Sequence, residues 1–303
     1  MANSSRKNSE TVPSGMILLR KGPGVTSFDS LGAVKRALGS GKAGHTGTLD
    51  RFAEGLLVVL TGRALKLSQW FARCDKRYEG AIRFGAETDT LDPEGAVVAE
   101  APPPSREAVE GALALFRGKI EQAPPEYSAI HIGGERASAL ARRGEAPEMK
   151  KRPVEIYRLE LSSWDPPFAG VSVHCSGGTY IRSLARDIAL AAGSRAHLSA
   201  LLRTRVAGFR LEDAACADEA PALFPRPIDR SVFRALGVGC VEAGPEGARK
   251  IALGAPLRAA LGEDALRGAS SPAAVFAGES LLAVVERTAE GGPWRYGRVY
   301  ARD

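Results

Sequence analysis

The chain has 303 residues, and its 41 lysines and arginines against 35 aspartates and glutamates give a formal net charge of +6. Hydrophobic residues make up 44% and charged residues 25%, which is typical of a globular chain long enough for one large domain and a smaller one. The moderately positive balance is compatible with a polyanionic partner such as RNA, although many basic proteins bind none.

Cysteine and histidine spacing argues against disulfide scaffolds and metal sites. No Cys-x-x-Cys pair occurs among the four cysteines, which are Cys74, Cys175, Cys216 and Cys240. The four histidines show no metal-binding spacing. The N-terminus is polar and lacks the apolar core of a secretory signal, and no segment is apolar for long enough to span a bilayer. A reducing cytoplasm is the expected setting.

Short apolar runs and amphipathic segments alternate along the chain and predict strands and helices. Strands are expected at 16–19, 56–60, 78–84, 97–99, 154–161 and 171–175. Helices are expected from Thr26 or Ser27 to Gly39, around 64–71, from Ser105, and over 180–191. A turn at 92–95 is expected between two of the strands, and the glycine-rich segment 39–50 is expected to be a loop.

Changes in composition divide the chain into a tail, a large domain and a small domain. Residues 1–14 are polar and are expected to form a disordered tail. The large domain is expected over 15–228. Its segment at about 122–152 lacks strong periodicity, and we interpret it as a functional excursion from the core. From 229 to 303, apolar runs alternate with glycine-rich turns and predict a small β domain. Its strands are expected at 273–276, 281–286 and 296–300.

The densest cluster of chemically useful residues lies in the segment 43–50, which reads Ala-Gly-His-Thr-Gly-Thr-Leu-Asp. His45 lies between the two glycines, and Asp50 ends the cluster shortly before a buried strand. Glycine allows close backbone approach, and a loop between a helix and a strand can fix a reactive side chain. Asp50 is therefore either a turn or cap residue or a catalytic carboxylate, and local sequence leaves both interpretations open.

Arg182 and two tyrosines each have a structural and a functional interpretation. Arg182 falls in the first turn of a predicted helix, where a cation gains nothing from the helix dipole. It is either exposed or directed at an anion, and pairing with Asp50 would lower the pKa of that carboxyl and fix its direction. Tyr78 follows an Asp-Lys-Arg run and is either a half-buried sheet residue or a stacking face for a base. Tyr180 has the same two interpretations.

Basic residues within and next to the segment 122–152 form a candidate phosphate-binding group. They are Arg142, Arg143, Lys150, Lys151 and Arg152. Runs of like charge are usually solvated faces, and contacts to RNA phosphates are the alternative. The sequence predicts the group without choosing between these two roles.

Seven segments taken together resemble, in order, the motifs of the TruB-type pseudouridine synthases. The stretch 44–50 resembles the family's Gly-His-x-Gly-Thr/Ala-Leu-Asp signature, and the match continues through Ala53, Gly55 and Leu57. The other segments are 21–27, 75–78, 88–95, 125–129, 178–182 and 201–205. Several motifs in order are far more specific than any one of them. The resemblance covers about residues 15–210.

The resemblance assigns roles to individual residues. It implies that Asp50 is the catalytic aspartate, that Arg182 is its partner, and that Tyr78 stacks on the target uracil. The further residues implied as contacts to a flipped nucleotide are His45, Tyr180 and Leu201. It also implies an α/β (α+β) catalytic domain whose mixed, mainly antiparallel sheet is flanked by helices. An RNA-gripping insertion and a small C-terminal PUA-like β domain complete the expected architecture, although the C-terminal resemblance is weak.

The activity that the resemblance implies is isomerisation of the T-loop uridine at position 55 of tRNA to pseudouridine. The uridine is expected to flip out of the RNA, and an Asp-dependent exchange replaces the C1′–N1 bond with a C1′–C5 bond. No metal or organic cofactor is expected. The expected partner is the tRNA T-stem-loop, bound by a monomer without an obligatory protein partner and without a membrane.

Two positions depart from the family pattern. Arg51 stands directly after Asp50 where the family usually has proline, and Gly22 replaces a proline of the first motif. Neither change removes a reacting group, so activity is still expected, with both loops less rigid and with an added cation beside the RNA. The alternatives are a non-catalytic RNA-binding or tRNA-folding protein on the same scaffold, and a relative that modifies another RNA within a guide complex.

Overall fold

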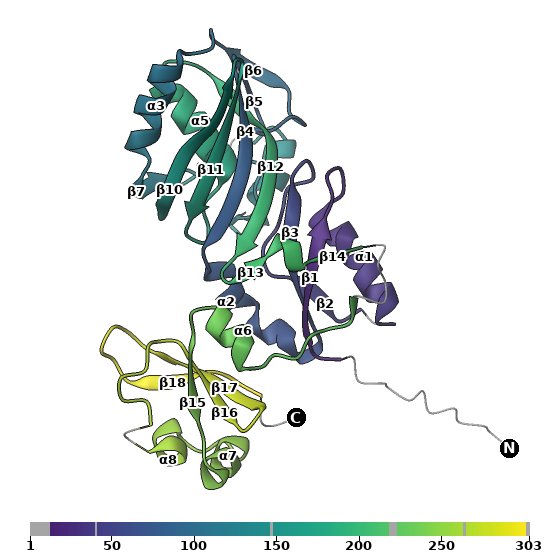
Figure 1. The fold of residues 1–303 in the computed structure, drawn as a ribbon, viewed down its shortest axis with the longest axis vertical. Coiled ribbons are helices and arrows are strands. Elements are labelled where there is room, and N and C mark those ends of the chain that lie inside the picture. The colour runs from purple at the N-terminus through teal and green to yellow at the C-terminus, as the bar shows by residue number, and fades with distance from the viewer. Residues whose placement is uncertain (1–12, 40, 146–147, 218–222, 263–264, 301–303) are drawn as a thin grey trace, which may run out of the picture.

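The computed structural model describes residues 13–39, 41–145, 148–217, 223–262 and 265–300. These residues form a large domain on a ten-stranded sheet and a small domain on a four-stranded sheet (Figure 1). The mixture of strands and helices confirms the predicted α/β (α+β) class.

The large sheet is mixed and mainly antiparallel, as predicted. Its strand order is β14-β1-β3-β12-β4-β11-β10-β7, with β2 paired to β3 and β13 paired to β12. The strands are β1 (Gly15–Lys21), β2 (Ala43–His45), β3 (Glu54–Thr61), β4 (Lys76–Phe84), β7 (Gly118–Gln122), β10 (Arg152–Asp165), β11 (Phe168–Cys175), β12 (Ala196–Val206), β13 (Phe209–Arg210) and β14 (Ala215–Cys216). The pairs β1–β14 and β3–β12 are parallel, and the other neighbouring pairs are antiparallel.

Helices pack on the sheet along their apolar stripes. The helices of the large domain are α1 (Ser27–Ala37), α2 (Ser68–Arg73), α3 (Arg106–Leu115), α4 (Ala137–Arg142) and α5 (Ile181–Ala191), with 3-10 turns η1 (Gly62–Leu67) and η2 (Leu211–Asp213). α3 and α5 lie together beside the strands β10 and β11 (Figure 1). There Leu113 and Leu184 join Val171 in one buried cluster. At the other end of the sheet, Val34 of α1 packs against Val59 of β3.

The central strands β3 and β4 differ in sequence because they differ in how many of their faces are buried. β3 is apolar along its length because both of its faces are buried, with Leu57 turned toward α1 and Leu56 toward a second apolar cluster. β4 alternates, since Tyr78 and Ile82 are buried while their neighbours Arg77 and Arg83 are exposed. The loop of residues 46–53 lies between β2 and β3, and it carries Asp50.

One local prediction was wrong, and two were right in kind but incomplete. The segment 97–99 is a strand, β6 (Val97–Glu100), but it pairs with β5 (Ala86–Thr88) and not with β4. Gly85 has φ +105°, a left-handed conformation that ends β4 and redirects the chain before β5. The segment 39–50 was predicted as loop throughout, yet it contains β2. The helix predicted near 64–71 is η1 followed by the short α2.

The segment between β7 and β10 stands apart from the large sheet. It contains the small hairpin β8 (His131–Ile132) and β9 (Glu135–Arg136), followed directly by α4. β7 ends at Gln122 and β10 begins at Arg152. The predicted insertion of about 122–152 therefore joins two neighbouring strands of the sheet.

The small domain contains more helix than the sequence predicted. Its sheet has the order β15-β16-β17-β18, formed by β15 (Gly239–Glu242), β16 (Ala273–Ala277), β17 (Ser280–Arg287) and β18 (Trp294–Val299). The helices are α6 (Arg230–Ala235), α7 (Pro245–Ala252) and α8 (Leu257–Leu261). The last three strands lie where strands were expected. The helices have only 6, 8 and 5 residues, so each is too short to give a clear helical period.

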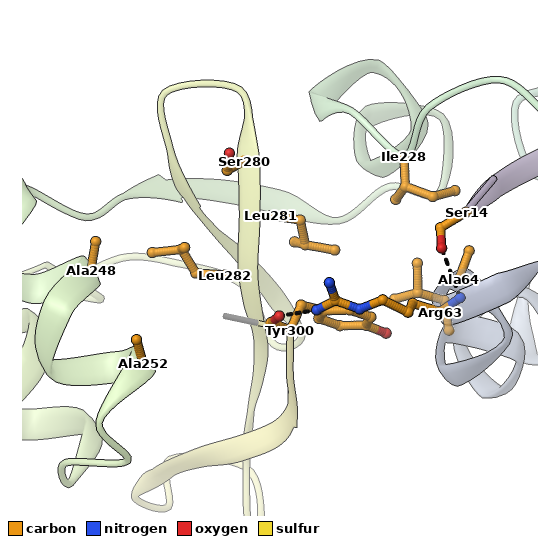
Figure 2. Close-up of a pocket in the computed structure, with 11 residues that line it drawn as sticks. Ser14, Arg63, Ala64, Ile228, Ala248, Ala252, Ser280, Leu281, Leu282 and Tyr300 are labelled. Carbon is orange, nitrogen blue, oxygen red and sulfur yellow. Dashed lines mark hydrogen bonds between the residues drawn. The ribbon is translucent and has the colours of Figure 1, made fainter. Parts of the chain in front are cut away.

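The two domains share one apolar cluster and line a cavity that is open to solvent. Phe276 and Val284 of the small domain pack with Trp70 and Phe71 of the large domain. The cavity between the domains has a volume of about 500 Å³. In Figure 2, Arg63 points across it toward Tyr300, whose backbone carbonyl accepts a hydrogen bond from the Arg63 guanidinium. None of the site residues predicted from sequence lines this cavity.

Candidate active site

Asp50 and Arg182 come together although 132 positions separate them in the sequence. Nη2 of Arg182 donates to Oδ1 of Asp50 at 3.1 Å, and Nε lies 3.0 Å from Oδ2. The Arg182 side chain is 4% exposed and the Asp50 side chain 35% exposed. This two-point contact fixes the direction of the carboxylate and leaves part of it accessible.

Backbone and side-chain acceptors from two other segments hold the guanidinium of Arg182. Nη1 donates to the carbonyl of Thr90 at 2.6 Å and to Oδ2 of Asp92 at 3.3 Å. Nη2 also donates to the carbonyl of Tyr127 at 2.9 Å. The turn after β5 and the start of the insertion therefore meet at the same side chain. Asp92 was not singled out from the sequence as a site residue, although it lies within one of the segments that resemble family motifs.

The pKa of Asp50 corrects one expectation. Pairing with Arg182 was expected to lower this pKa, and the guanidinium does act in that direction. Loss of hydration acts more strongly, and the Asp92 carboxylate adds to it, so the pKa of Asp50 is raised above its ordinary value of 3.8. The sequence could not weigh burial against pairing because burial depends on segments distant in the chain.

Lys21 ties the other side of the Asp50 loop to β1. Its Nζ donates to the carbonyls of Gly22 at 3.0 Å and Arg51 at 3.3 Å, and also to that of Ala53. Lys21 is 1% exposed, and burial lowers its pKa to about 8. The loop that leaves Asp50 is thus held by a buried lysine from the first strand.

Arg51 and Gly22, the two departures from the family pattern, lie on neighbouring loops. The amide of Gly24 donates to the Arg51 carbonyl at 2.8 Å, and Nε of Arg51 donates back to the Gly24 carbonyl at 2.9 Å. The expectation of looser loops is therefore offset at Arg51, whose side chain ties the two loops together. The guanidinium also lies 3.9 Å from Glu94, with 62% of the Arg51 side chain exposed.

Tyr78 lies on β4 and is 6% exposed. It belongs to the same buried cluster as Leu49, the residue before Asp50. Burial raises the pKa of Tyr78 to about 12, so its hydroxyl stays protonated at neutral pH. Because so little of the ring is exposed, stacking on a base requires a neighbouring segment to move aside.

The three implied nucleotide contacts occupy different elements. His45 is half-buried on β2, and burial lowers its pKa, which favours a neutral ring. Its Nδ1 is buried and has no hydrogen-bond partner among the described residues. Leu201 is 7% exposed on β12. Tyr180 precedes α5, and its backbone amide and carbonyl both bond to the side chain of Gln122 at 2.8 and 3.0 Å.

The five candidate phosphate contacts divide into residues with a described ion pair, ring contact or hydrogen bond and residues without one. Arg143 pairs with Glu135 and Glu145, each at 2.9 Å. Arg152 lies over the Tyr180 ring, 4.9 Å from its centroid, and donates to the Gly178 carbonyl. The remaining three are exposed, namely Arg142, Lys150 and Lys151. The exposed residues are the better candidates for RNA phosphates because no described ion pair competes for them.

The described residues hold no group of three or more histidine, cysteine, aspartate or glutamate side chains placed to bind a metal ion. All four cysteines are free thiols. Within the described part of the chain, no helix has the length and apolarity needed to cross a membrane.

Comparison with known proteins points to one family. A family model described as TruB family pseudouridylate synthase (N terminal domain) matches residues 35–181. The tRNA pseudouridine synthase B of Treponema denticola is 46% identical over 223 residues, which cover 67% of this chain and 62% of that protein. The tRNA pseudouridine synthase B of Borreliella burgdorferi is 44% identical over 66% of this chain and 72% of that protein. The protein of the same name from Symbiobacterium thermophilum is 47% identical over 69% of this chain and 71% of that protein. The aligned region thus spans less than two thirds of the Treponema protein.

Solved structures extend the likeness to the small domain. A Cbf5-Nop10-Gar1 complex contains a chain with a TM-score of 0.68 and 23% identity, covering 95% of this chain and 84% of that one. An archaeal box H/ACA sRNP Nop10-Cbf5 complex gives a TM-score of 0.67 and 22% identity, covering 97% and 88%. At these identities the likeness concerns the fold, and its coverage includes both domains.

Proposed function

We propose that this chain, which belongs to the TruB family of pseudouridine synthases, converts a uridine of tRNA into pseudouridine. The observation that carries the proposal is the contact between Asp50 and Arg182 at the end of the Gly-His-Thr-Gly-Thr-Leu-Asp segment. Its relatives of 44–47% identity are named tRNA pseudouridine synthase B. The finer part of the proposal is that the target is the T-loop uridine at position 55.

The reaction detaches uracil N1 from ribose C1′ and joins uracil C5 to the same carbon. A glycoside hydrolase needs two carboxylates, because one protonates a departing group while the other attacks or activates water. Here the base stays in the site and no water attacks, so one carboxylate can suffice. Asp50 in its ionised form, directed by Arg182, is the group we assign to this role.

The other site residues are proposed to receive the flipped uridine. A base taken out of its RNA stack loses stacking energy, which an aromatic side chain can replace at about 1–3 kcal/mol per base. Tyr78 is proposed for that stack. Contacts to the nucleotide are proposed for His45, Tyr180 and Leu201, and contacts to RNA phosphates for the basic residues of the insertion.

The oligomeric state, compartment and partner of the protein are also proposed. The protein is proposed to act as a monomer in the cytoplasm, on the tRNA T-stem-loop and without an obligatory protein partner. Four free thiols are compatible with a reducing compartment. A non-catalytic RNA-binding or tRNA-folding role remains the alternative, and the accessible, arginine-paired Asp50 argues for catalysis instead.

The decisive experiment measures tritium release from uracil-5-labelled T-loop RNA by the wild type and by Asp50→Asn. We expect release by the wild type and none above background by the variant, because the amide cannot act as a nucleophile or a base. Asp75→Asn is the matched control, since Asp75 is also 35% exposed and paired, in this case with His174. Full activity of Asp50→Asn would refute the catalytic assignment. RNA binding without release by the wild type would favour the alternative function.

A further inference from the structure

The backbone that leads into Asp50 is held by side chains from other elements. Along 47–52 the chain leaves the strand ladder, after the Thr46 amide has bonded to the Val58 carbonyl at 3.0 Å. We propose that Ser27 and Arg203 are positioning residues, which hold the segment Gly47–Leu49 so that the Asp50 carboxylate meets Arg182. This inference rests on the proposed function and gives individual roles to two residues that the sequence analysis named only as parts of the segments 21–27 and 201–205.

Ser27 satisfies both backbone groups of the residue before Asp50. Its Oγ donates to the Leu49 carbonyl at 2.9 Å and accepts from the Leu49 amide at 2.8 Å. Ser27 is 2% exposed, so water does not compete for these bonds. The cap of α1 is provided by Thr26 and Asp29, which leaves the Ser27 hydroxyl available for the loop.

Arg203 spans the loop and the following strand with one planar group. Its Nη2 and Nη1 donate to the carbonyls of Gly47 at 3.0 Å and Thr48 at 3.3 Å, while Nε donates to the Leu56 carbonyl at 2.7 Å. The residue is 3% exposed. Three acceptors at fixed positions suit a guanidinium, whereas the ammonium of lysine is a single point that cannot reproduce the fork. Arg203 also pairs across the sheet with Tyr78, so it joins the loop to the proposed stacking residue.

Asp50 and Arg182 are held in place by two different sets of contacts. Arg182 is fixed by α5 and by acceptors at Thr90 and Tyr127, none of which contacts Ser27 or Arg203 through a described hydrogen bond. Loss of either positioning residue therefore moves Asp50 while Arg182 stays in place. A displacement of about 1 Å at a reacting group can cost on the order of 100-fold in rate.

The test compares Ser27→Ala with Ser30→Ala in single-turnover tritium release. Ser30 lies in the same helix, is 8% exposed, and bonds only to the Thr26 carbonyl among its described hydrogen bonds. We expect Ser27→Ala to lower the rate by about 10- to 100-fold with unchanged affinity for tRNA, and Ser30→Ala to keep the wild-type rate. The pH profile adds a readout that general destabilisation would not move. A misplaced Asp50 loses part of the pKa-lowering contact with Arg182, so the acid limb should shift to higher pH.

Arg203 is tested by Arg203→Ala, by Arg203→Lys and by added guanidinium ion. We expect both variants to be slow, and guanidinium to restore part of the rate of Arg203→Ala alone. Arg117→Ala is the control, because Arg117 also forks onto a carbonyl of the sheet, that of Leu159, away from the loop. Equal rates for Ser27→Ala and Ser30→Ala, or rate losses matched by loss of folded protein, would overturn the inference. An inactive wild type would overturn the proposed function itself, whereas a Ser27→Ala variant with the full wild-type rate would overturn only the positioning role.

Discussion

Arg182 holds two carboxylates with one buried guanidinium. Nε and Nη2 face Asp50, and Nη1 contacts Asp92 at 3.3 Å. We expect Arg182→Lys to lower turnover by at least about 100-fold, because one ammonium cannot keep the fork geometry. Affinity for tRNA should stay within about twofold, since a side chain that is 4% exposed offers little surface to RNA.

Single-turnover rates and tRNA binding measured on the same preparation would test this prediction. Arg186→Lys serves as control, because Arg186 lies one helical turn further along α5 and pairs with Asp187. Loss of tRNA affinity with normal turnover would contradict the role given to Arg182.

At the residue scale, we also assign the acid limb of the pH–rate profile to the ionisation of Asp50. Burial raises the pKa of Asp50 above 3.8, and catalysis requires the ionised carboxylate. Because the pKa is raised, the ionised fraction at a given acid pH is smaller than for an ordinary aspartate. As the pH is lowered, the rate should therefore begin to fall at a higher pH than it would for a carboxyl group with a pKa of 3.8. Single-turnover tritium release measured from neutral to acid pH checks the sign, and a limb at or below 3.8 would contradict it.

At the scale of elements, the parallel contact between β3 and β12 brings the Asp50 loop beside Arg203. Gly55 makes this contact possible, since its φ is +112° and a Cβ there would lie 2.7 Å from the Arg203 amide nitrogen. We expect Gly55→Ala to destabilise the fold by at least about 2 kcal/mol, from backbone strain and from the clash with a neighbouring strand. Urea unfolding measures the effect.

Gly22→Ala provides the comparison for this substitution. Gly22 has no neighbour within 4 Å of its would-be Cβ, and no left-handed φ. It should change stability by no more than about 0.5 kcal/mol. Similar unfolding midpoints for the two variants would show that the close approach of the strands matters less than the distances indicate.

For the whole molecule, the apolar cluster shared by the two domains predicts that they unfold together. Phe276 of the small domain is fully buried and meets Phe233 edge-on with ring centroids 5.7 Å apart. Phe276→Ala should cost about 3–5 kcal/mol. The loss should lower the unfolding midpoint reported by Trp164 in the large domain as well as by Trp294 in the small one.

Variants that lack either Trp164 or Trp294, both keeping Trp70 of the shared cluster, allow the signals of the two domains to be compared by fluorescence. Leu253→Ala is the matched control, because Leu253 is a large apolar residue of the small domain that is 73% exposed. A shift confined to Trp294 would mean that the domains unfold independently.

The sequence by itself determined what depends on neighbours along the chain. The run 56–60 predicted a buried strand, and Thr26 or Ser27 predicted the start of α1, because apolar period and capping are local properties. The glycine-rich segment singled out Asp50, and the resemblance to family motifs proposed Arg182 as its partner. Short helices such as α7 and α8 escaped prediction because they span too few residues to show a period.

Only the tertiary structure decided how those residues act on one another. The segments that carry Asp50, Thr90 and Tyr127 meet at Arg182 in the first turn of α5, and no local pattern encodes that meeting. The same holds for Ser27, which the sequence offered as a candidate helix start within the motif segment 21–27 and whose hydroxyl in the fold bonds both backbone groups of Leu49. The pKa of Asp50 rises rather than falls for the same reason, since burial is a property of the assembled protein and pairing is only one part of it.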